Sequence, residues 1–304
     1  MKILVLYFTQ TGQILDILKQ ITSVFESHQV DFVPFNTQRV FPYPWSSATF
    51  FDAMPESHLK IAEPIQTLPD IDMDAYDLVI LGYQPWFLAP SIPTTSFLKS
   101  EWAKRLSGKK VITVIGSRNM WLNAQEAIKE MLHNIGAQLV GNIVLEDKHG
   151  NMTSTLTIIR WLFKGQKQGS GLLPAAGVSE EDIAQTAQFG KLIQTTLATQ
   201  NWHQLQAELI AAKAVTLKTN LIILERRGVA NFPKFAHKIV AKGAPGDVAR
   251  KPLTNVFKNL LIVSIFILSP ITNAIGKLQS WMQKKKLQEE AEYFKSVAYT
   301  PNKM

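Results

Sequence analysis

The sequence contains no cysteine among its 304 residues. This absence excludes disulfide bonds, thiolate nucleophiles and zinc–thiolate sites, and it is compatible with a reducing cytosol. The six histidines are scattered without the spacing of metal ligands, so we predict no metal site. The sequence also lacks internal repeats and any base-reading module, and we expect no nucleic-acid partner.

We also expect no secretory signal at the N-terminus. The apolar run at residues 3–8 is too short for the hydrophobic region of a signal peptide, and it leads into a polar loop. Hydrophobic residues make up 46% of the chain and charged residues 18%, which predicts a packed core. We therefore expect a folded cytoplasmic protein.

Charge is divided unevenly along the chain. Residues 1–150 contain 12 Lys/Arg and 15 Asp/Glu, a net charge of −3, whereas residues 151–304 contain 20 and 9, a net charge of +11. A basic C-terminal half suits anionic lipid head groups or acidic partners. The pattern indicates a protein that can contact an anionic membrane surface, at the inner face of the cytoplasmic membrane.

Strands and helices alternate over the first two thirds of the chain. Apolar runs predict strands at 3–8, 29–35, 76–82, 109–116 and 138–145, and apolar periodicity predicts helices at 12–27, 96–106, 122–135 and 179–196. Residues 41–57, rich in proline and aromatics, are expected to form an irregular insertion. The alternation predicts an α/β fold with a doubly wound five-stranded parallel sheet over residues 1–198, followed by a mostly helical basic extension over 199–304.

Three loops follow strands on the edge of such a sheet where ligands bind. The first contains Thr9, Gln10, Thr11, Gly12 and Gln13, directly before a helix. Backbone N–H groups at a helix N-terminus, with threonine and glutamine donors and a glycine that allows close approach, suit a terminal monophosphate. A tight strand-to-helix turn with a capping threonine would use the same residues, and the segment alone does not separate the two readings.

The other two loops add aromatic and amide side chains. Tyr83, Trp86 and Phe87 follow the third strand, and Ser117, Arg118 and Asn119 follow the fourth. Aromatic faces near amides suit a planar, polar heterocycle, although each ring alone is explained by ordinary packing. Their joint position favours a flat cofactor.

The pattern Tyr7-x-Thr9-x-x-Gly12 after a first strand resembles the FMN phosphate loop of flavodoxins and related quinone reductases. The resemblance covers roughly residues 1–150. It implies that the first loop holds the FMN phosphate and that the other two loops surround the isoalloxazine ring. The phosphate residues would be Thr9, Gln10, Thr11, Gly12 and Gln13, and the ring residues Tyr83, Gln84, Trp86, Phe87, Ser117, Arg118 and Asn119. The chain departs from the family at Ile14, where a final threonine is usual.

A closer resemblance extends to about residue 185. The segments YFTQTGQ, GYQPWFLAPSIPTTSFL, VITVIGSRNMW and LLPAAGVSEEDI resemble bacterial flavodoxin-like proteins known as dialkylresorcinol condensing enzymes. That name implies joining two acyl-derived chains into an aryl lipid. Condensing enzymes of the ketosynthase type hold the acyl group on a cysteine, which this chain lacks, so a redox or accessory role on a ring intermediate is favoured.

An uncharged stretch of 18 residues lies between Lys258 and Lys277. It is slightly shorter than a spanning helix requires, and basic residues flank both ends. A marginal membrane span, an interfacial helix and a buried helix all remain open for residues 259–276.

These observations predict an FMN-binding protein that transfers electrons to, or reduces, a small quinone-like or aryl-lipid molecule. Its partners would be that aromatic substrate or a redox partner protein. Arg118 could stabilise negative charge on a reduced flavin or a substrate oxygen, but no catalytic acid–base pair emerges. The alternatives are an accessory protein that keeps the fold without the flavin, and an aryl-lipid biosynthetic enzyme that uses the crevice for another ligand.

Overall fold

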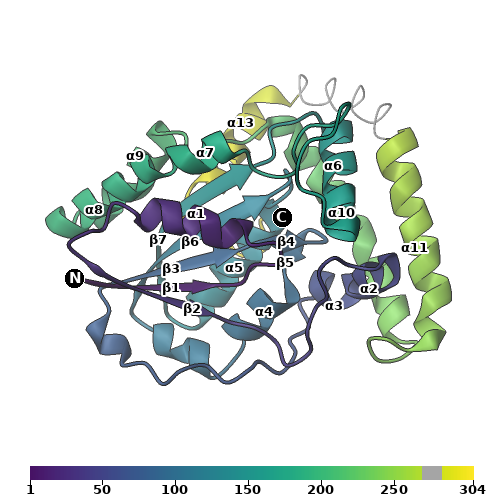
Figure 1. Cartoon of the computed structure of the whole chain (residues 1–304), viewed down its shortest axis with the longest axis horizontal. Helices are drawn as coiled ribbons and strands as arrows, with labels where there is room; N and C mark the ends of the chain where they lie inside the picture. Colours follow the sequence, from purple (N-terminus) through teal and green to yellow (C-terminus); the bar gives the residue numbers. More distant parts are fainter. Residues whose placement is uncertain (269–282) are drawn as a thin grey trace.

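A five-stranded parallel sheet forms the centre of the protein in the computed structural model, which describes residues 1–268 and 283–304 (Figure 1). Every neighbouring pair of its strands is parallel, and the predicted apolar runs form these strands because they are covered on both faces. The strands are β1 (Lys2–Tyr7), β2 (Gln29–Pro34), β3 (Leu78–Tyr83), β6 (Lys110–Ser117) and β7 (Gln138–Glu146).

The spatial order of the strands is β2-β1-β3-β6-β7. Counted along the chain within this sheet, the order is 2-1-3-4-5, which is the flavodoxin-like order. It reverses direction between β1 and β3, and ligands of such sheets bind beyond the carboxyl ends of the strands at this point. The predicted α/β fold class is confirmed.

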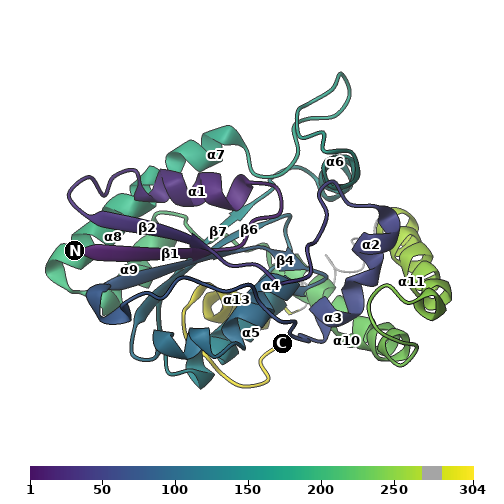
Figure 2. The ribbon, with the colours of Figure 1, turned by 60° about the horizontal axis from the view of Figure 1, so that its bottom comes forward.

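Helices cover both faces of the sheet (Figure 2). In α1, Ile14, Ile17, Leu18 and Ile21 recur at a spacing of three or four residues, and all four are buried against the sheet. One face carries α1 (Gln13–Thr22), α7 (Glu180–Gln185), α8 (Ala187–Thr199) and α9 (Trp202–Ala211); the other carries α4 (Ile92–Leu98), α5 (Leu122–Asn134) and α13 (Lys284–Lys295).

Residues 41–57 are not irregular throughout, as the sequence had suggested. They contain α2 (Ser47–Asp52) and α3 (Met54–His58), and the Ser46 side chain caps α2 by accepting the N–H of Thr49. The expected helix at 96–106 begins earlier, as α4, and continues as a 3₁₀ helix at Trp102–Leu106. The expected helix at 179–196 is divided into α7 and α8.

The carboxyl ends of the strands face a group of helices from distant parts of the chain (Figure 1). Here α2 and α3 pack against α10 (Thr219–Val240) and α11 (Lys251–Val263), around a small apolar core that includes Met54, Ile239 and Phe257. Helix α6 (Asn151–Lys164), which the sequence did not predict, lies at the same end. The division between residues 198 and 199 stays a prediction.

The apolar stretch at 259–276 is described only up to Leu268. Residues 259–263 complete α11 and Ser264–Leu268 continue it as a π-helix, whereas residues 269–276 lie outside the described residues. In the described part of the chain, no helix combines the length and the apolarity needed to cross a membrane.

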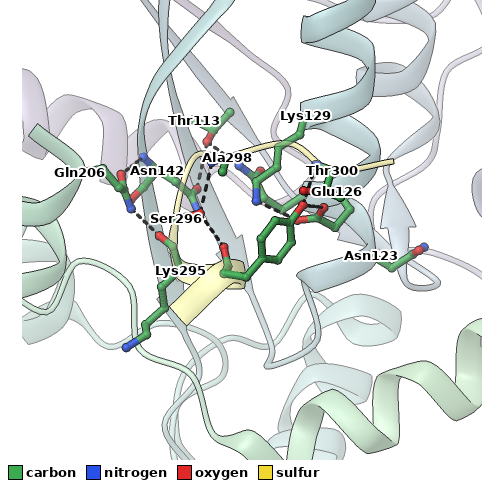
Figure 3. A network of polar contacts seen from close by, with 12 residues as sticks. Thr113, Asn123, Glu126, Lys129, Asn142, Gln206, Lys295, Ser296, Ala298 and Thr300 are labelled. Atoms are coloured by element: carbon green, nitrogen blue, oxygen red, sulfur yellow. Dashed lines mark hydrogen bonds and ion pairs between the residues drawn. The ribbon is translucent and has the colours of Figure 1, made fainter. Parts of the chain in front are cut away.

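A polar network joins the C-terminal helix to the sheet (Figure 3). Thr113 on β6 donates to Asn142 Oδ1 on β7 over 2.9 Å, and the Asn142 N–H donates to Gln206 Oε1 on α9 over 2.7 Å. Gln206 in turn donates to the Lys295 carbonyl over 2.7 Å. Beside it, the Tyr293 hydroxyl donates to Glu126 on α5 over 2.7 Å. The end of the chain is thereby fastened to the sheet.

Candidate functional site

The first crevice loop joins β1 to α1, and its Thr9, Gln10, Thr11 and Gly12 are half-buried. Gly12 has φ = 89°, in the left-handed region, and no atom lies within 4 Å of the position a Cβ would take. The Gly12 N–H donates to Thr9 Oγ1 over 3.0 Å, which closes a tight turn. Since the first N–H groups of a helix lack intrahelical partners, they and the helix dipole suit this loop to a phosphate.

The two glutamines of this loop are held by other backbone segments. Gln10 Nε2 donates to the Pro42 carbonyl over 2.9 Å. The buried Gln13 amide makes a pair of bonds with Val178, donating to its carbonyl over 2.9 Å and accepting its N–H over 3.1 Å. Their side chains therefore position neighbouring loops, and a phosphate role of Gln13 would rest on its backbone N–H.

Ile14 occupies the position of the usual threonine and is a core residue. Its side chain packs beneath the ends of β3 and β6: a Cβ on Gly82 would lie 3.0 Å from Ile14 Cγ2, and a Cβ on Gly116 would lie 2.8 Å from Ile14 Cδ1. The Ile14 side chain thus packs against the ends of both strands that lead into the second and third predicted loops. This places the three predicted loops around the N-terminus of α1, without a hydroxyl at position 14.

The loop after β3 is a short hairpin whose aromatic residues pack on the protein itself. Its strands are β4 (Pro85–Trp86) and β5 (Ala89–Pro90), and Phe87 at its tip has φ = 47°. The Phe87 ring lies 4.7 Å from that of Phe50. The Trp86 ring makes edge-to-face contacts, with centroid separations of 5.1–5.6 Å, with the rings of Phe8, Phe41 and Trp45.

Tyr83 and Gln84 lie in different environments although they are adjacent. Tyr83 is fully buried, its hydroxyl donates to Gln125 Oε1 over 2.7 Å, and burial raises its pKa well above the ordinary value. Gln84 is half-buried, and its Oε1 accepts the Gln10 N–H at 3.4 Å. The structure therefore brings Gln84 to the first loop and places Tyr83 in the core.

The loop after β6 contacts the start of α6. Arg118 Nη1 donates to Asn151 Oδ1 over 2.9 Å and to Thr155 Oγ1 over 2.7 Å. Asn119 Nδ2 also donates to Asn151 Oδ1, over 3.3 Å. Burial lowers the pKa of Arg118 to about 10, and the nearby Asp147 carboxylate partly opposes this shift. Arg118 remains a cation at neutral pH, held half-buried beside the crevice.

Several polar atoms near this loop are buried without a hydrogen-bond partner among the described residues. They include Ser117 Oγ and Asn119 Oδ1 on the loop, Asp147 Oδ2 after β7, and Ser154 Oγ on α6. Asp147 is joined to the loop because its N–H donates to the Ser117 carbonyl over 3.1 Å. Buried polar groups are normally satisfied, so these atoms indicate where water or a polar ligand would bind.

Sequence reasoning did not single out the acidic residues after β7. Trp121 Nε1 donates to Glu146 Oε1 over 2.6 Å, and burial raises the pKa of Glu146 to about 7. Asp147 accepts from His149 Nδ1 over 2.6 Å. Glu146 is the last residue of β7, and Asp147, Lys148 and His149 directly follow it. Their position at the carboxyl end of a strand was the signal that could have indicated them.

A second missed carboxyl group comes from the C-terminal half. Glu225 on α10 is fully buried and accepts the Asn123 N–H over 2.8 Å at the start of α5. Burial raises its pKa to about 8, and the Glu146 carboxylate adds to this effect. Helix α10 therefore caps the helix that follows the Arg118 loop, at the cost of burying a carboxyl group.

This burial predicts a pH-dependent stability. The Glu225 carboxyl ionises near 4.5 in the unfolded chain and near 8 in the folded protein. Between these values the folded state holds more protons, so its free energy of unfolding falls as pH rises. Glu225→Gln keeps the acceptor oxygen but cannot ionise. In urea titrations, we expect wild type to lose stability relative to this variant between roughly pH 5 and pH 9; a constant difference would contradict the assignment.

A separate cleft of about 430 Å³ lies beyond β7. Glu146 is on its wall, together with Lys148, Asp182 and Lys213, and none of the predicted cofactor residues lines it. The cleft is therefore distinct from the candidate site at the first loop, which lies where the strand order reverses.

No family model matches this chain, and no curated protein matches it. Among solved structures, it is similar to a flavoprotein in complex with FMN from Lactobacillus acidophilus NCFM (20% identity, TM-score 0.40, covering 47% of this chain and 92% of that one). It is also similar to a WrbA-like flavodoxin from Agrobacterium tumefaciens (12%, 0.36, 62% and 92%) and to oxidised flavodoxin 2 from Bacillus cereus (18%, 0.31, 54% and 99%). The fold assignment rests on the strand order, and these similarities assign no ligand.

Proposed function

We propose that the chain binds FMN in the crevice between the Thr9–Gly12 loop and the Ser117–Asn119 loop. The observation that carries this proposal is the position of the first loop, with its open glycine, at the reversal of strand order between β1 and β3. The first-turn N–H groups and the hydroxyls of Thr9 and Thr11 would hold the phosphate. Gln84 and the unpartnered Ser117 Oγ and Asn119 Oδ1 would bind the polar edge of the ring system.

Bound FMN supplies one- and two-electron redox chemistry, which the protein tunes through its contacts. In this crevice the Arg118 cation would favour a negatively charged group, such as the oxygen of a reduced quinone-like or aryl-lipid substrate. We propose reduction of such a molecule, or electron transfer to it, as the activity. Electrons would come from a redox partner protein or another reductant.

The test is a titration of the purified, flavin-free protein with FMN. We expect flavin fluorescence to be quenched with one FMN bound per chain, and the visible absorbance bands to shift. Once bound, chemically reduced FMN should be reoxidised by an added soluble quinone without oxygen. A protein that leaves FMN fluorescence unchanged at all concentrations would refute the proposal.

A second candidate is an accessory protein that keeps the fold without the flavin. Two sets of side-chain contacts favour it. The Gln13 amide is hydrogen-bonded to the Val178 backbone, and the rings of Trp86 and Phe87 pack on other aromatic residues of the protein. In this case the titration would show no FMN uptake, and product analysis of a deletion strain would report whether an aryl-lipid pathway needs the protein.

A further inference from the structure

Helix α6 turns an apolar stripe outward, while the side that faces the protein buries hydroxyl residues together with Trp161. Ser154, Thr155 and Thr157 are buried, and Thr155 bonds with Arg118 beside the crevice. Met152, Leu156 and Ile159 are 36–42% exposed, at the i, i+4, i+7 spacing of one helix face. The helix already packs on the protein through Trp161 and Phe163, so this stripe is a second apolar side, and it faces outward.

Helix α11 and its π-helical continuation show a second outward apolar face. Val256, Leu260, Val263 and Ile267 recur every three or four residues and are 40–61% exposed. The opposite side of α11 is anchored, since Phe257 is buried in the small core with α2 and α10. Helix α11 is therefore firmly packed on one side, and its other, apolar side is exposed to solvent.

Both helices lie at the end of the molecule where the strands finish (Figures 1 and 2). Helix α6 contacts the Arg118 loop directly, and α11 packs against α2. The apolar faces thus flank the end of the sheet that carries the candidate crevice. Isolated exposed apolar residues are ordinary, but seven on two helices at one end indicate an interaction surface.

Charge identifies the kind of partner. Residues 151–178, which include α6, contain three Lys/Arg and no Asp/Glu. Residues 226–268, which include α11, contain eight Lys/Arg, and Asp247 is their single acidic residue. One of the eight, Arg250, is buried in ion pairs, which leaves at most seven to face a partner. Exposed apolar helix faces within segments almost free of negative charge are typical of surfaces that bind anionic lipids.

We propose that the outward faces of α6 and α11 dock on an anionic lipid bilayer, with the apolar side chains entering the interface and the basic residues meeting the head groups. Docking does not depend on flavin. If the proposed function also holds, an aryl-lipid substrate would reach the candidate site from the membrane.

The experiment is co-sedimentation of the full chain with vesicles of phosphatidylcholine containing about 30 mol% phosphatidylglycerol. We expect wild type to sediment with these vesicles, less so as salt is raised, and to remain in solution with pure phosphatidylcholine. Leu156→Glu/Leu260→Glu should bind about tenfold more weakly, because each exposed carboxylate opposes both insertion and charge attraction. Val40→Glu places the same change at an exposed apolar residue outside both helices and should bind like wild type.

The double variant changes exposed positions, so thermal unfolding should match wild type and exclude misfolding as the cause. Wild type that stays in solution with anionic vesicles overturns the proposal, as does a double variant that binds them equally well. A lipid-free dimer in sedimentation velocity, dissociated by the double variant, would show that a second copy covers these faces and would also overturn it. FMN titration of the same samples tests the flavin proposal independently, because failure to bind vesicles and failure to bind FMN are measured separately.

Discussion

Replacing Arg250 by methionine is expected to lower the free energy of unfolding by about 3–5 kcal/mol. Arg250 is fully buried, its Nη2 lies 2.9 Å from Glu56 Oε2, and its Nε lies 3.2 Å from Asp52 Oδ1. Removing the cation leaves two largely buried carboxylates without a counter-ion. The two ion pairs also connect the residue directly before α11 to α2 and α3. The variant would therefore weaken the packing of α11 on these two helices.

Urea denaturation followed by circular dichroism measures this effect. The neighbouring Lys251 provides the matched control, because it is exposed and carries the same charge. Lys251→Met should change the free energy of unfolding by no more than about 0.5 kcal/mol. Equal stability of Arg250→Met and wild type would mean that hydrophobic replacement compensates for the lost ion pairs, as it can at some buried sites.

Gly12→Asp is expected to weaken FMN binding by about 100-fold, equivalent to about 2.8 kcal/mol. The space at the Gly12 Cβ position is open, so the carboxylate fits but stands where the phosphate would bind. Repulsion between the two anions opposes binding in this partly buried loop. Isothermal titration or fluorescence quenching with FMN measures the loss.

Gly108→Asp is the control for backbone strain. Gly108 has φ = 76°, close to the 89° of Gly12, and no atom lies within 4 Å of its Cβ position either. It precedes β6 and so lies at the amino ends of the strands, whereas the candidate site lies at their carboxyl ends. This variant should share the small stability loss of a left-handed aspartate and bind FMN normally. Unchanged FMN affinity in Gly12→Asp would place the phosphate elsewhere.

The sheet was predictable because each buried strand is a local apolar run bounded by turn residues. The position of the first loop was predictable for the same reason, since Gly12 and its threonines follow such a run directly. The partners of the loop residues were not: Gln13 bonds with Val178, and Asn123 bonds with Glu225, across more than a hundred residues. No local pattern encodes which distant group will satisfy a polar atom.

Helix α6 was missed for a related physical reason. Its buried side mixes serine and threonine with Trp161, and its exposed side carries methionine, leucine and isoleucine. Apolar residues therefore lie on both sides, and the hydrophobic pattern does not mark the side that contacts the protein. The aromatic residues of the β4–β5 hairpin were assigned to a cofactor by position alone. Phe87 packs on Phe50 of α2, a helix in a segment that composition had suggested was irregular, and Trp86 packs on Trp45 in the loop before that helix.

The contact of Ile14 with Gly82 and Gly116 limits how this site can evolve. Ile14→Thr would add a hydroxyl but remove the Cδ1 methyl group that packs against Gly116. A side chain at Gly116 would collide with Ile14 Cδ1 but find room beside a smaller residue, whereas one at Gly82 would still lie 2.5 Å from Leu18 Cδ1. Substitutions at positions 14 and 116 are therefore interdependent, and the first loop cannot be remodelled at Ile14 without repacking the end of β6.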